Sequence, residues 1–207
     1  MSFEVLTLYF FVAFFYIISP GPAIFLAISN NIKIVALSSF GNILGLFILS
    51  AVSISGLGAI LTTSATLFMI VKIIGALYLL HIGIKQFKTI GSIKLSENNT
   101  HKHNKKGSKA FFYEGFFLSV TNPKPIIFFI ALFPQFLNLE NSILPQFFLL
   151  TFTFIFISFF SLLTYGLIAK NVKRYLNDSN KMNWFHKITG GLFIIMGLGL
   201  LQIKRTQ

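Results

Sequence analysis

Six long apolar runs, separated by short polar links, dominate this sequence and limit what it can fold into. They cover residues 5–28, 36–61, 67–84, 110–137, 143–169 and 188–203. A helix needs about 20 apolar residues to cross the hydrocarbon core of a bilayer, so each run can span, with the third and sixth near the lower limit. The runs lack the alternation of outer-membrane barrel strands. The sequence therefore predicts an all-α, polytopic protein with six transmembrane helices in the lipid bilayer.

The composition excludes several other classes of protein. Of the 207 residues, 55% are hydrophobic and 11% are charged, whereas a soluble domain carries about 25% charged residues. Cysteine is absent, which excludes thiol redox chemistry and thiolate metal sites, and we predict no cofactor. The only charge before Lys33 is Glu4. The first run therefore lacks the basic segment of a cleaved signal peptide, and we expect it to stay in the mature protein.

The net charge of +12 has a simple explanation in a membrane protein. In a soluble protein it would suggest a nucleic-acid partner, but Lys and Arg are enriched in the cytoplasmic loops of polytopic proteins. Basic residues gather after the first, third and fifth runs: Lys33; Lys85, Lys88, Lys94, Lys102, Lys105, Lys106 and Lys109; Lys170, Lys173, Arg174, Lys181 and Lys187. The opposite links have none. We predict no nucleic-acid binding, a multi-pass protein of the bacterial inner (plasma) membrane, and two outward-facing termini.

The longest polar stretch, residues 87–109, has three apolar runs on either side. We interpret it as a flexible, basic cytoplasmic linker. It would join a first three-helix repeat, residues 1–86, to a second, residues 110–207. Its histidines, His101 and His103, have no carboxylate or cysteine at ligand spacing, so we predict no metal site.

An odd number of spans in each half inserts the second half with opposite polarity, as in inverted-repeat transporters. The third and sixth runs support such a duplication. Residues 72–80 read Lys-Ile-Ile-Gly-Ala-Leu-Tyr-Leu-Leu, and residues 187–195 read Lys-Ile-Thr-Gly-Gly-Leu-Phe-Ile-Ile. The sequence thus favours a 3+3 inverted repeat, although chance similarity between apolar helices is an alternative.

Prolines interrupt the first and fourth runs at corresponding places. Residues 20–22 read Pro-Gly-Pro and residues 122–125 read Asn-Pro-Lys-Pro. Two prolines within three residues remove two amide donors and disfavour helix at the preceding residue. Unpaired backbone groups are costly in lipid, so such breaks are tolerated where they are buried in protein or line a wet cavity. The alternative is a pair of plain kinks. The predicted substrate-binding residues are Pro20, Gly21, Pro22, Asn122, Pro123 and Lys124.

Broken helices at mid-membrane offer carbonyl groups to an ammonium and N–H groups to a carboxylate. Lys124 adds a positive charge that costs about 2.5 to 3.5 kcal/mol at the bilayer centre. Either carbonyls and water inside the bundle offset this cost, or Lys124 is also the counter-ion of an anionic cargo group. We predict alternating access, in which the two halves rock about the breaks.

Two other titratable residues are candidates for carrying a coupling proton. Glu114 lies about one turn inside the fourth run, and it alternatively caps the helix or pairs with Lys109. His81 lies near the inner end of the third run and is alternatively a packed or interfacial side chain. Small residues also suggest close helix packing. These are Gly41 and Gly45 in the second run, and Gly75 and Gly83 in the third.

Together these motifs make the chain similar to the LysE/RhtB family of bacterial amino-acid exporters. The similarity covers nearly the whole length. It rests on Pro20-Gly21-Pro22, Gly41, Gly45, Lys72, Gly75-Ala76-Leu77-Tyr78-Leu79, Gly83, Gly115, Asn122-Pro123-Lys124 and Phe133-Pro134-Gln135-Phe136. This resemblance implies proton-coupled efflux of small amino acids or derivatives, such as threonine, homoserine, homoserine lactone, leucine or lysine.

One departure narrows the expected cargo. Many family members have Asp or Asn directly after the Pro-Gly-Pro motif, whereas this chain has Ala23. With Lys124 present, we expect a neutral, zwitterionic amino acid. The alternatives are a divalent-cation exporter of the same superfamily, and a passive channel or assembly factor. An intramembrane enzyme is disfavoured because the runs contain one marginal Glu, one His and no Asp. Association of several copies is left open.

Overall fold

The computed structural model describes residues 1–19, 21–63, 65–89, 107–138, 140–169, 171–172 and 178–202, and every regular element within them is helical. The elements are α1 (Phe3–Ile18), α2 (Pro22–Ser29), α3 (Ile32–Thr63), α4 (Ala65–Lys88), α5 (Ser108–Thr121), α6 (Pro123–Ile127), a π-helix η3 (Phe128–Leu132), a 3₁₀ helix η4 (Phe133–Phe136), α7 (Ile143–Leu167) and α9 (Ser179–Gln202). The predicted all-α fold is confirmed.

Four of these helices, α3, α4, α7 and α9, are long and apolar enough to cross a membrane. Two bent pairs bring the number to six if each pair counts as one span. The first pair, α1 and α2, bends by 61°. The second, α5 followed by residues Pro123–Phe136, bends by 47°. The broken first and fourth spans therefore lie where the prolines predict them, although Pro20 itself is outside the described residues.

The helices extend past the apolar runs where polar residues can reach water. Helix α9 begins at Ser179, well before the run that starts at residue 188. The Asp178 carboxylate accepts hydrogen bonds from the backbone N–H groups of Asn180 and Lys181, at 3.1 and 3.2 Å. This arrangement satisfies N–H groups that have no partner inside the helix. Hydropathy alone places the start too late because it reports the hydrocarbon core and not the helix.

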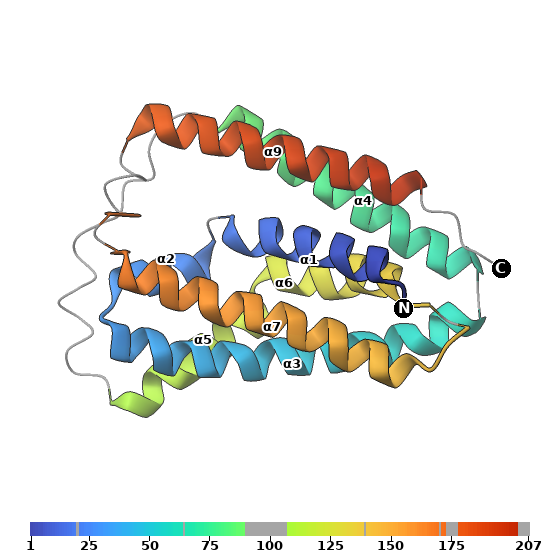
Figure 1. Cartoon of the computed structure of the whole chain (residues 1–207), viewed down its shortest axis with the longest axis horizontal. Coiled ribbons are helices and arrows are strands. Elements are labelled where there is room, and N and C mark those ends of the chain that lie inside the picture. Colours follow the sequence, from blue (N-terminus) through green and yellow to red (C-terminus); the bar gives the residue numbers. More distant parts are fainter. Residues whose placement is uncertain are drawn as a thin grey trace.

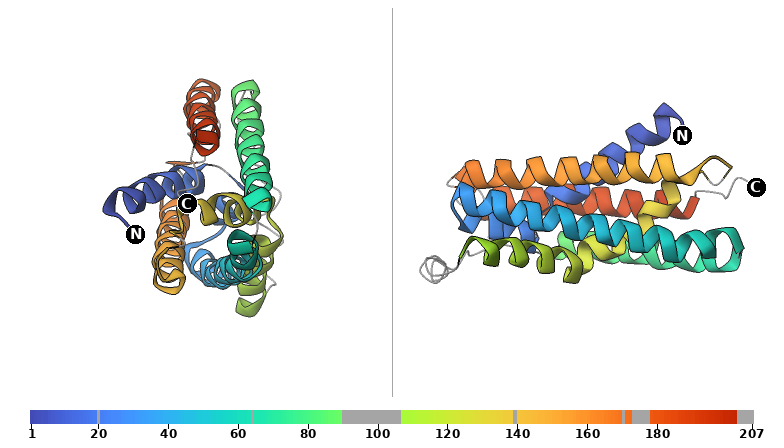
Figure 2. Two further views of the ribbon diagram at one scale, coloured as in Figure 1. Left: turned by 90° about the vertical axis from the view of Figure 1, so that its right-hand side faces the viewer. Right: turned by 90° about the horizontal axis from the view of Figure 1, so that it is seen from below.

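The helices pack in a pair and a group of three, with α1 passing between them (Figures 1 and 2). Helix α4 lies beside α9, and α3 lies beside α5 and α7. The start of α1 and the end of α9 lie at the same end of the bundle. Basic residues occur at the opposite end, which we call the basic end: Lys33, Lys85, Lys88, Lys109 and Lys181. Most of the linker, residues 90–106, lies outside the described residues, and the division into repeats stays a prediction.

Two apolar clusters fill the interior. The larger, which we call the aromatic cluster, lies toward the end where α1 starts and includes Tyr9, Phe128, Phe129, Phe133 and Phe154. Their rings meet mostly edge to face or tilted, as between Phe128 and Phe154 at 4.5 Å. The smaller, which we call the aliphatic cluster, lies toward the basic end and contains Ile24, Ala27, Ile28, Val35, Leu162, Val172 and Met182. The breaks lie between the two clusters.

Candidate functional site

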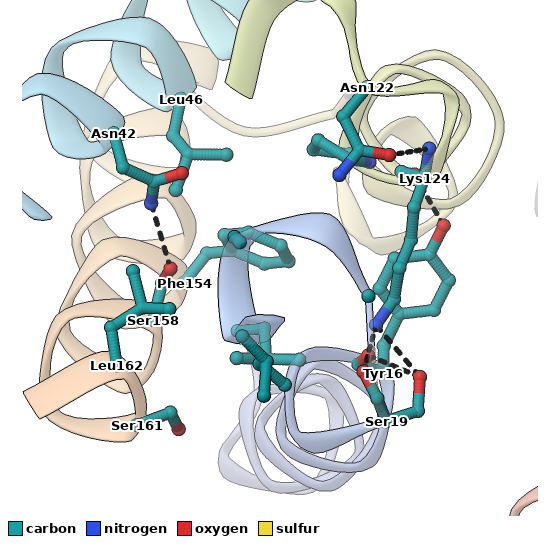
Figure 3. Close-up of a pocket in the computed structure, with 15 residues that line it drawn as sticks. Tyr16, Ser19, Asn42, Leu46, Asn122, Lys124, Phe154, Ser158, Ser161 and Leu162 are labelled. Carbon is teal, nitrogen blue, oxygen red and sulfur yellow. Dashed lines mark hydrogen bonds between the residues drawn. The ribbon is translucent and has the colours of Figure 1, made fainter. Parts of the chain in front are cut away.

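The two helix breaks line one cavity inside the bundle (Figure 3). Its volume is about 60 Å³, which is room for several waters because one needs about 10–15 Å³. Three of the predicted substrate-binding residues line it: Gly21, Asn122 and Lys124. Pro22 and Pro123, the first residues of α2 and α6, are not among the lining residues. The structure thus brings together two segments that the sequence separates widely.

Lys124 connects the second break to the first. Its ammonium group donates hydrogen bonds to the backbone carbonyl and the hydroxyl of Ser19, both at 2.7 Å. It also lies 5.1 Å from the centre of the Tyr16 ring, within the range of a cation–π contact. The Tyr16 hydroxyl in turn donates to the Lys124 backbone carbonyl. No carboxylate lies among the residues that line the cavity. The positive charge is therefore offset by the carbonyl end of α1, a hydroxyl and a ring face.

The first break leaves backbone groups of both polarities near the cavity. Helix α1 ends at Ile18, and the next residue, Ser19, has an extended backbone. The Tyr165 hydroxyl from α7 donates to the Ile18 carbonyl at 2.8 Å, so the last carbonyl of α1 has a partner. Helix α2 starts after Gly21, and no side chain caps its N-terminus. Because Gly21 and Ala23 line the cavity, the N-terminal end of α2 faces it with amide groups that can receive an anion.

The second break satisfies its own backbone. The Asn122 side chain accepts a hydrogen bond from the backbone N–H of Lys124 at 3.0 Å and caps α6. After one short helix the chain forms the π-helix η3, which shifts backbone groups out of the regular α-helical pattern. The Ser53 hydroxyl of α3 donates to the Phe129 carbonyl there. The irregular backbone thus finds partners in protein, as the low dielectric of a membrane requires.

The wall opposite Lys124 comes from α3 and α7 (Figure 3). The Asn42 side-chain amide donates to the Ser158 hydroxyl at 3.1 Å. Ser161 also lines the cavity. Motif reasoning missed Asn42 and Ser158, and the contacts of Lys124 with Tyr16 and Ser19. A signal for Asn42 exists, because it is the only amide side chain within the run 36–61 and polar groups are costly there.

The two predicted proton carriers do not line this cavity. Glu114 lies partly exposed on α5, and His81 is exposed on α4. A different histidine is buried near the basic end, where His186 of α9 pairs through Nδ1 with the Gln86 side chain of α4. Among the described residues, no three His, Cys, Asp or Glu side chains are grouped as metal ligands. If Glu114 or His81 couples proton movement to transport, it must therefore do so without lining the cavity at the breaks.

The predicted packing glycines lie at two helix–helix contacts. A Cβ atom on Gly41 would overlap the backbone carbonyl of Phe112, and one on Gly45 would overlap the Ser119 hydroxyl. Both contacts join α3 to α5. A Cβ on Gly115 of α5 would likewise overlap the carbonyl of Ser38. We call this contact, formed by Gly41, Gly45 and Gly115, the glycine seam.

The third-run glycines lie on α4. A Cβ on Gly83 would come within 2.8 Å of the Gly190 carbonyl of α9. A Cβ on Gly75 would overlap Ala131 of η3. These close approaches hold α4 against both α9 and the second broken span.

Comparison with protein families decides where this chain belongs. The family model for the LysE type translocator matches residues 14–203, which include both breaks and nearly the whole chain. The chain belongs to the LysE type translocator family. The resemblance drawn from the proline and glycine motifs is thereby confirmed. No solved structure matches the chain.

Relatives of this LysE type translocator span most of its length. An "Uncharacterized membrane protein" of Vibrio cholerae is 32% identical, with 97% of each chain covered. A "Homoserine/homoserine lactone efflux protein" of Salmonella typhi is 32% identical over 69% of this chain and 67% of its own. A "Leucine efflux protein" of Enterobacter sp. is 30% identical over 90% of this chain and 88% of its own. Two of these names describe amino-acid efflux.

Proposed function

We propose that this LysE type translocator is a secondary transporter that exports small neutral amino acids or their derivatives. The observation that carries the proposal is the cavity lined by both helix breaks, with Lys124 in its wall. Relatives named for homoserine and leucine efflux support the cargo class. The cavity wall offers one cation, Lys124, and otherwise neutral groups, which suits a zwitterion better than a dibasic amino acid.

The cargo carboxylate would bind between Lys124 and the N-terminal end of α2. A lysine ammonium has three donors, and Ser19 takes two of them. The third is left for a carboxylate, next to the uncapped amide groups after Gly21. The cargo ammonium would bind backbone carbonyl groups freed by the prolines, away from the Lys124 ammonium. Lys124 thus both bridges the breaks and serves as the counter-ion.

Alternating access would proceed by rocking of residues 1–86 against residues 110–207. The aromatic cluster lies on the side of the cavity where α1 starts, and the aliphatic cluster lies on the side of the basic end. Opening one cluster while the other stays closed would expose the cavity to one side at a time. The predicted inverted repeat would suit this motion, because each half contributes one broken span to the same cavity.

The basic end would face the bacterial cytoplasm, so that both termini face outward across the inner membrane. The gathering of Lys33, Lys85, Lys88, Lys109 and Lys181 at one end supports this orientation. Export would then carry cargo from the basic end past the aliphatic cluster to the cavity. Protons moving inward would drive it, with Glu114 or His81 near the basic end as carriers.

The decisive experiment is a growth-inhibition screen over amino acids and analogues, with and without overexpression of the protein. Overexpression is expected to protect cells against one or more small neutral amino acids, and preloaded cells are expected to release that compound faster. A vesicle assay then measures whether transport depends on the proton gradient. Transport that equilibrates cargo without any gradient dependence would instead indicate a passive channel. Protection against divalent cations alone would indicate the cation exporter.

A further inference from the structure

Asn42 and Ser158 form a hydrogen-bonded polar pair in a largely apolar part of the cavity wall. Their relative exposures are 5% and 6%, and Leu46, Phe154 and Leu162 line the cavity around them. A buried polar pair in such surroundings is costly unless its hydrogen bonds are completed. Its position across the cavity from Lys124 (Figure 3) separates it from the groups that would hold the cargo carboxylate.

The pair presents one acceptor and one donor to the cavity. The Asn42 amide nitrogen donates to the Ser158 oxygen at 3.1 Å, and Figure 3 shows the Asn42 carbonyl oxygen turned toward the cavity. No hydrogen bond from a described residue reaches that oxygen. The Ser158 hydroxyl accepts from Asn42 and keeps its own proton to donate. A hydroxyl group is the ligand that completes both, since it donates and accepts at one atom.

Asn42 also borders a second, smaller cavity of about 10 Å³, which lies toward the basic end beside Ser38 and Ser39. Ala23 and Leu162 line both cavities as well. The Ser39 hydroxyl is buried without a hydrogen-bond partner among the described residues. Asn42 therefore stands where the two cavities meet, and cargo moving between them would pass its side chain.

We propose that Asn42 and Ser158 recognise the side chain of the cargo through hydrogen bonds. They would favour a cargo whose side chain can form hydrogen bonds over one with an apolar side chain of equal size. This inference rests on the proposed export of amino acids. When the carboxylate is bound at Lys124, the cargo side chain extends toward the opposite wall. A side-chain hydroxyl completes the pair's hydrogen bonds, whereas a methyl group in its place leaves a buried acceptor and a buried donor unpaired.

The test compares isosteric cargo pairs in vesicles that contain the purified protein. Threonine and valine differ by a hydroxyl in place of a methyl group, and so do homoserine and norvaline. The wild-type protein is expected to exchange the hydroxyl member of each pair at least about tenfold more efficiently. Ser158→Ala is expected to reduce this preference to about threefold or less, with norvaline exchange kept. Asn42→Leu should do the same, and the double variant should add little because the two residues form one unit.

The matched control is Ser55→Ala, an exposed serine on α3 whose hydroxyl bonds only within its own helix, to the Ala51 carbonyl. It is expected to keep the wild-type preference. If Asn42→Leu does not insert, Ser158→Ala decides the question because it removes only a hydroxyl. If the variants lose exchange of both members of a pair equally, this inference alone is overturned. The same holds if the wild-type protein exchanges the apolar members faster or shows no preference. A wild type that exchanges none of the four but exports another neutral amino acid also overturns this inference alone. A wild type that exports no amino acid in the growth-inhibition screen removes the proposed function, and this inference with it.

Discussion

The two helix breaks are built from similar proline motifs but differ in how their backbones are satisfied. At the first break, α2 starts after Gly21 with no side-chain cap. At the second, the Asn122 side chain caps α6 through the backbone N–H of Lys124. The first break therefore offers amide groups to the cavity, whereas the second offers a charged side chain and keeps its amides bonded.

The two breaks also differ in how they are packed. Helix α2 is short and lies on the small aliphatic cluster. The second broken span continues through η3 and η4 into the aromatic cluster, and its first half, α5, meets α3 along the glycine seam. We infer that the second break is a fixed support and that the first is the part that adapts. Packing, more than proline content, would decide which of the two breaks moves.

The largest expected effect comes from removing the bridge between the breaks. Lys124→Met deletes two charge-assisted hydrogen bonds to Ser19, and export from preloaded cells should fall at least about tenfold at equal protein level. Lys88→Met, at the exposed end of α4, is the control and should export normally. Parental export by a well-inserted Lys124→Met protein would show that the breaks need no charged bridge.

The next largest effect is a loss of stability, expected when the contact that holds the second broken span against α3 is disturbed. Gly115→Ala places a methyl group against the Ser38 backbone, which should destabilise the protein by about 1–3 kcal/mol. Thermal unfolding in detergent measures the loss. Gly56→Ala on α3, where a Cβ meets no atom within 4 Å, should be neutral or slightly stabilising. Equal melting temperatures for the two variants would contradict a rigid glycine seam.

A smaller loss of stability is expected when the second break is left without a side-chain cap, as the first break is. Asn122→Ala removes the cap of α6 and should cost about 1 kcal/mol of stability. Asn122→Ser retains a capping oxygen and should recover most of that stability. The same melting assay compares both with the parent. If alanine and serine behave alike, the hydrogen bond at 3.0 Å to the Lys124 amide does not stabilise this break.

The smallest effect on the fold comes from giving the first break the cap that it lacks. Gly21 has an extended backbone, with φ −157° and ψ 177°, which suits a capping serine. In Gly21→Ser the hydroxyl would bond the α2 amides that the cargo carboxylate needs, so export should fall a few-fold while the melting temperature stays level or rises slightly. Export at the parental rate would argue against a carboxylate site at α2.

Much of the fold could be predicted because it depends on local properties of the chain. Apolar length predicted the spans, and the prolines near Gly21 and Asn122 predicted the two bends. The cavity wall was harder, because membrane helices are apolar on the lipid side as well as the core side, so periodicity marks no inner face. Asn42 and Ser158 therefore went unnoticed.

By itself the sequence determined an all-α membrane protein with two proline-broken spans and one basic end, since hydropathy, proline geometry and charge act within a few residues. Only the tertiary structure decided that Lys124 reaches Ser19 instead of a carboxylate, and that Asn42 and Ser158 share its cavity. Such contacts join residues far apart in the chain, and their geometry depends on how whole helices pack. The site is therefore a property of the assembled bundle.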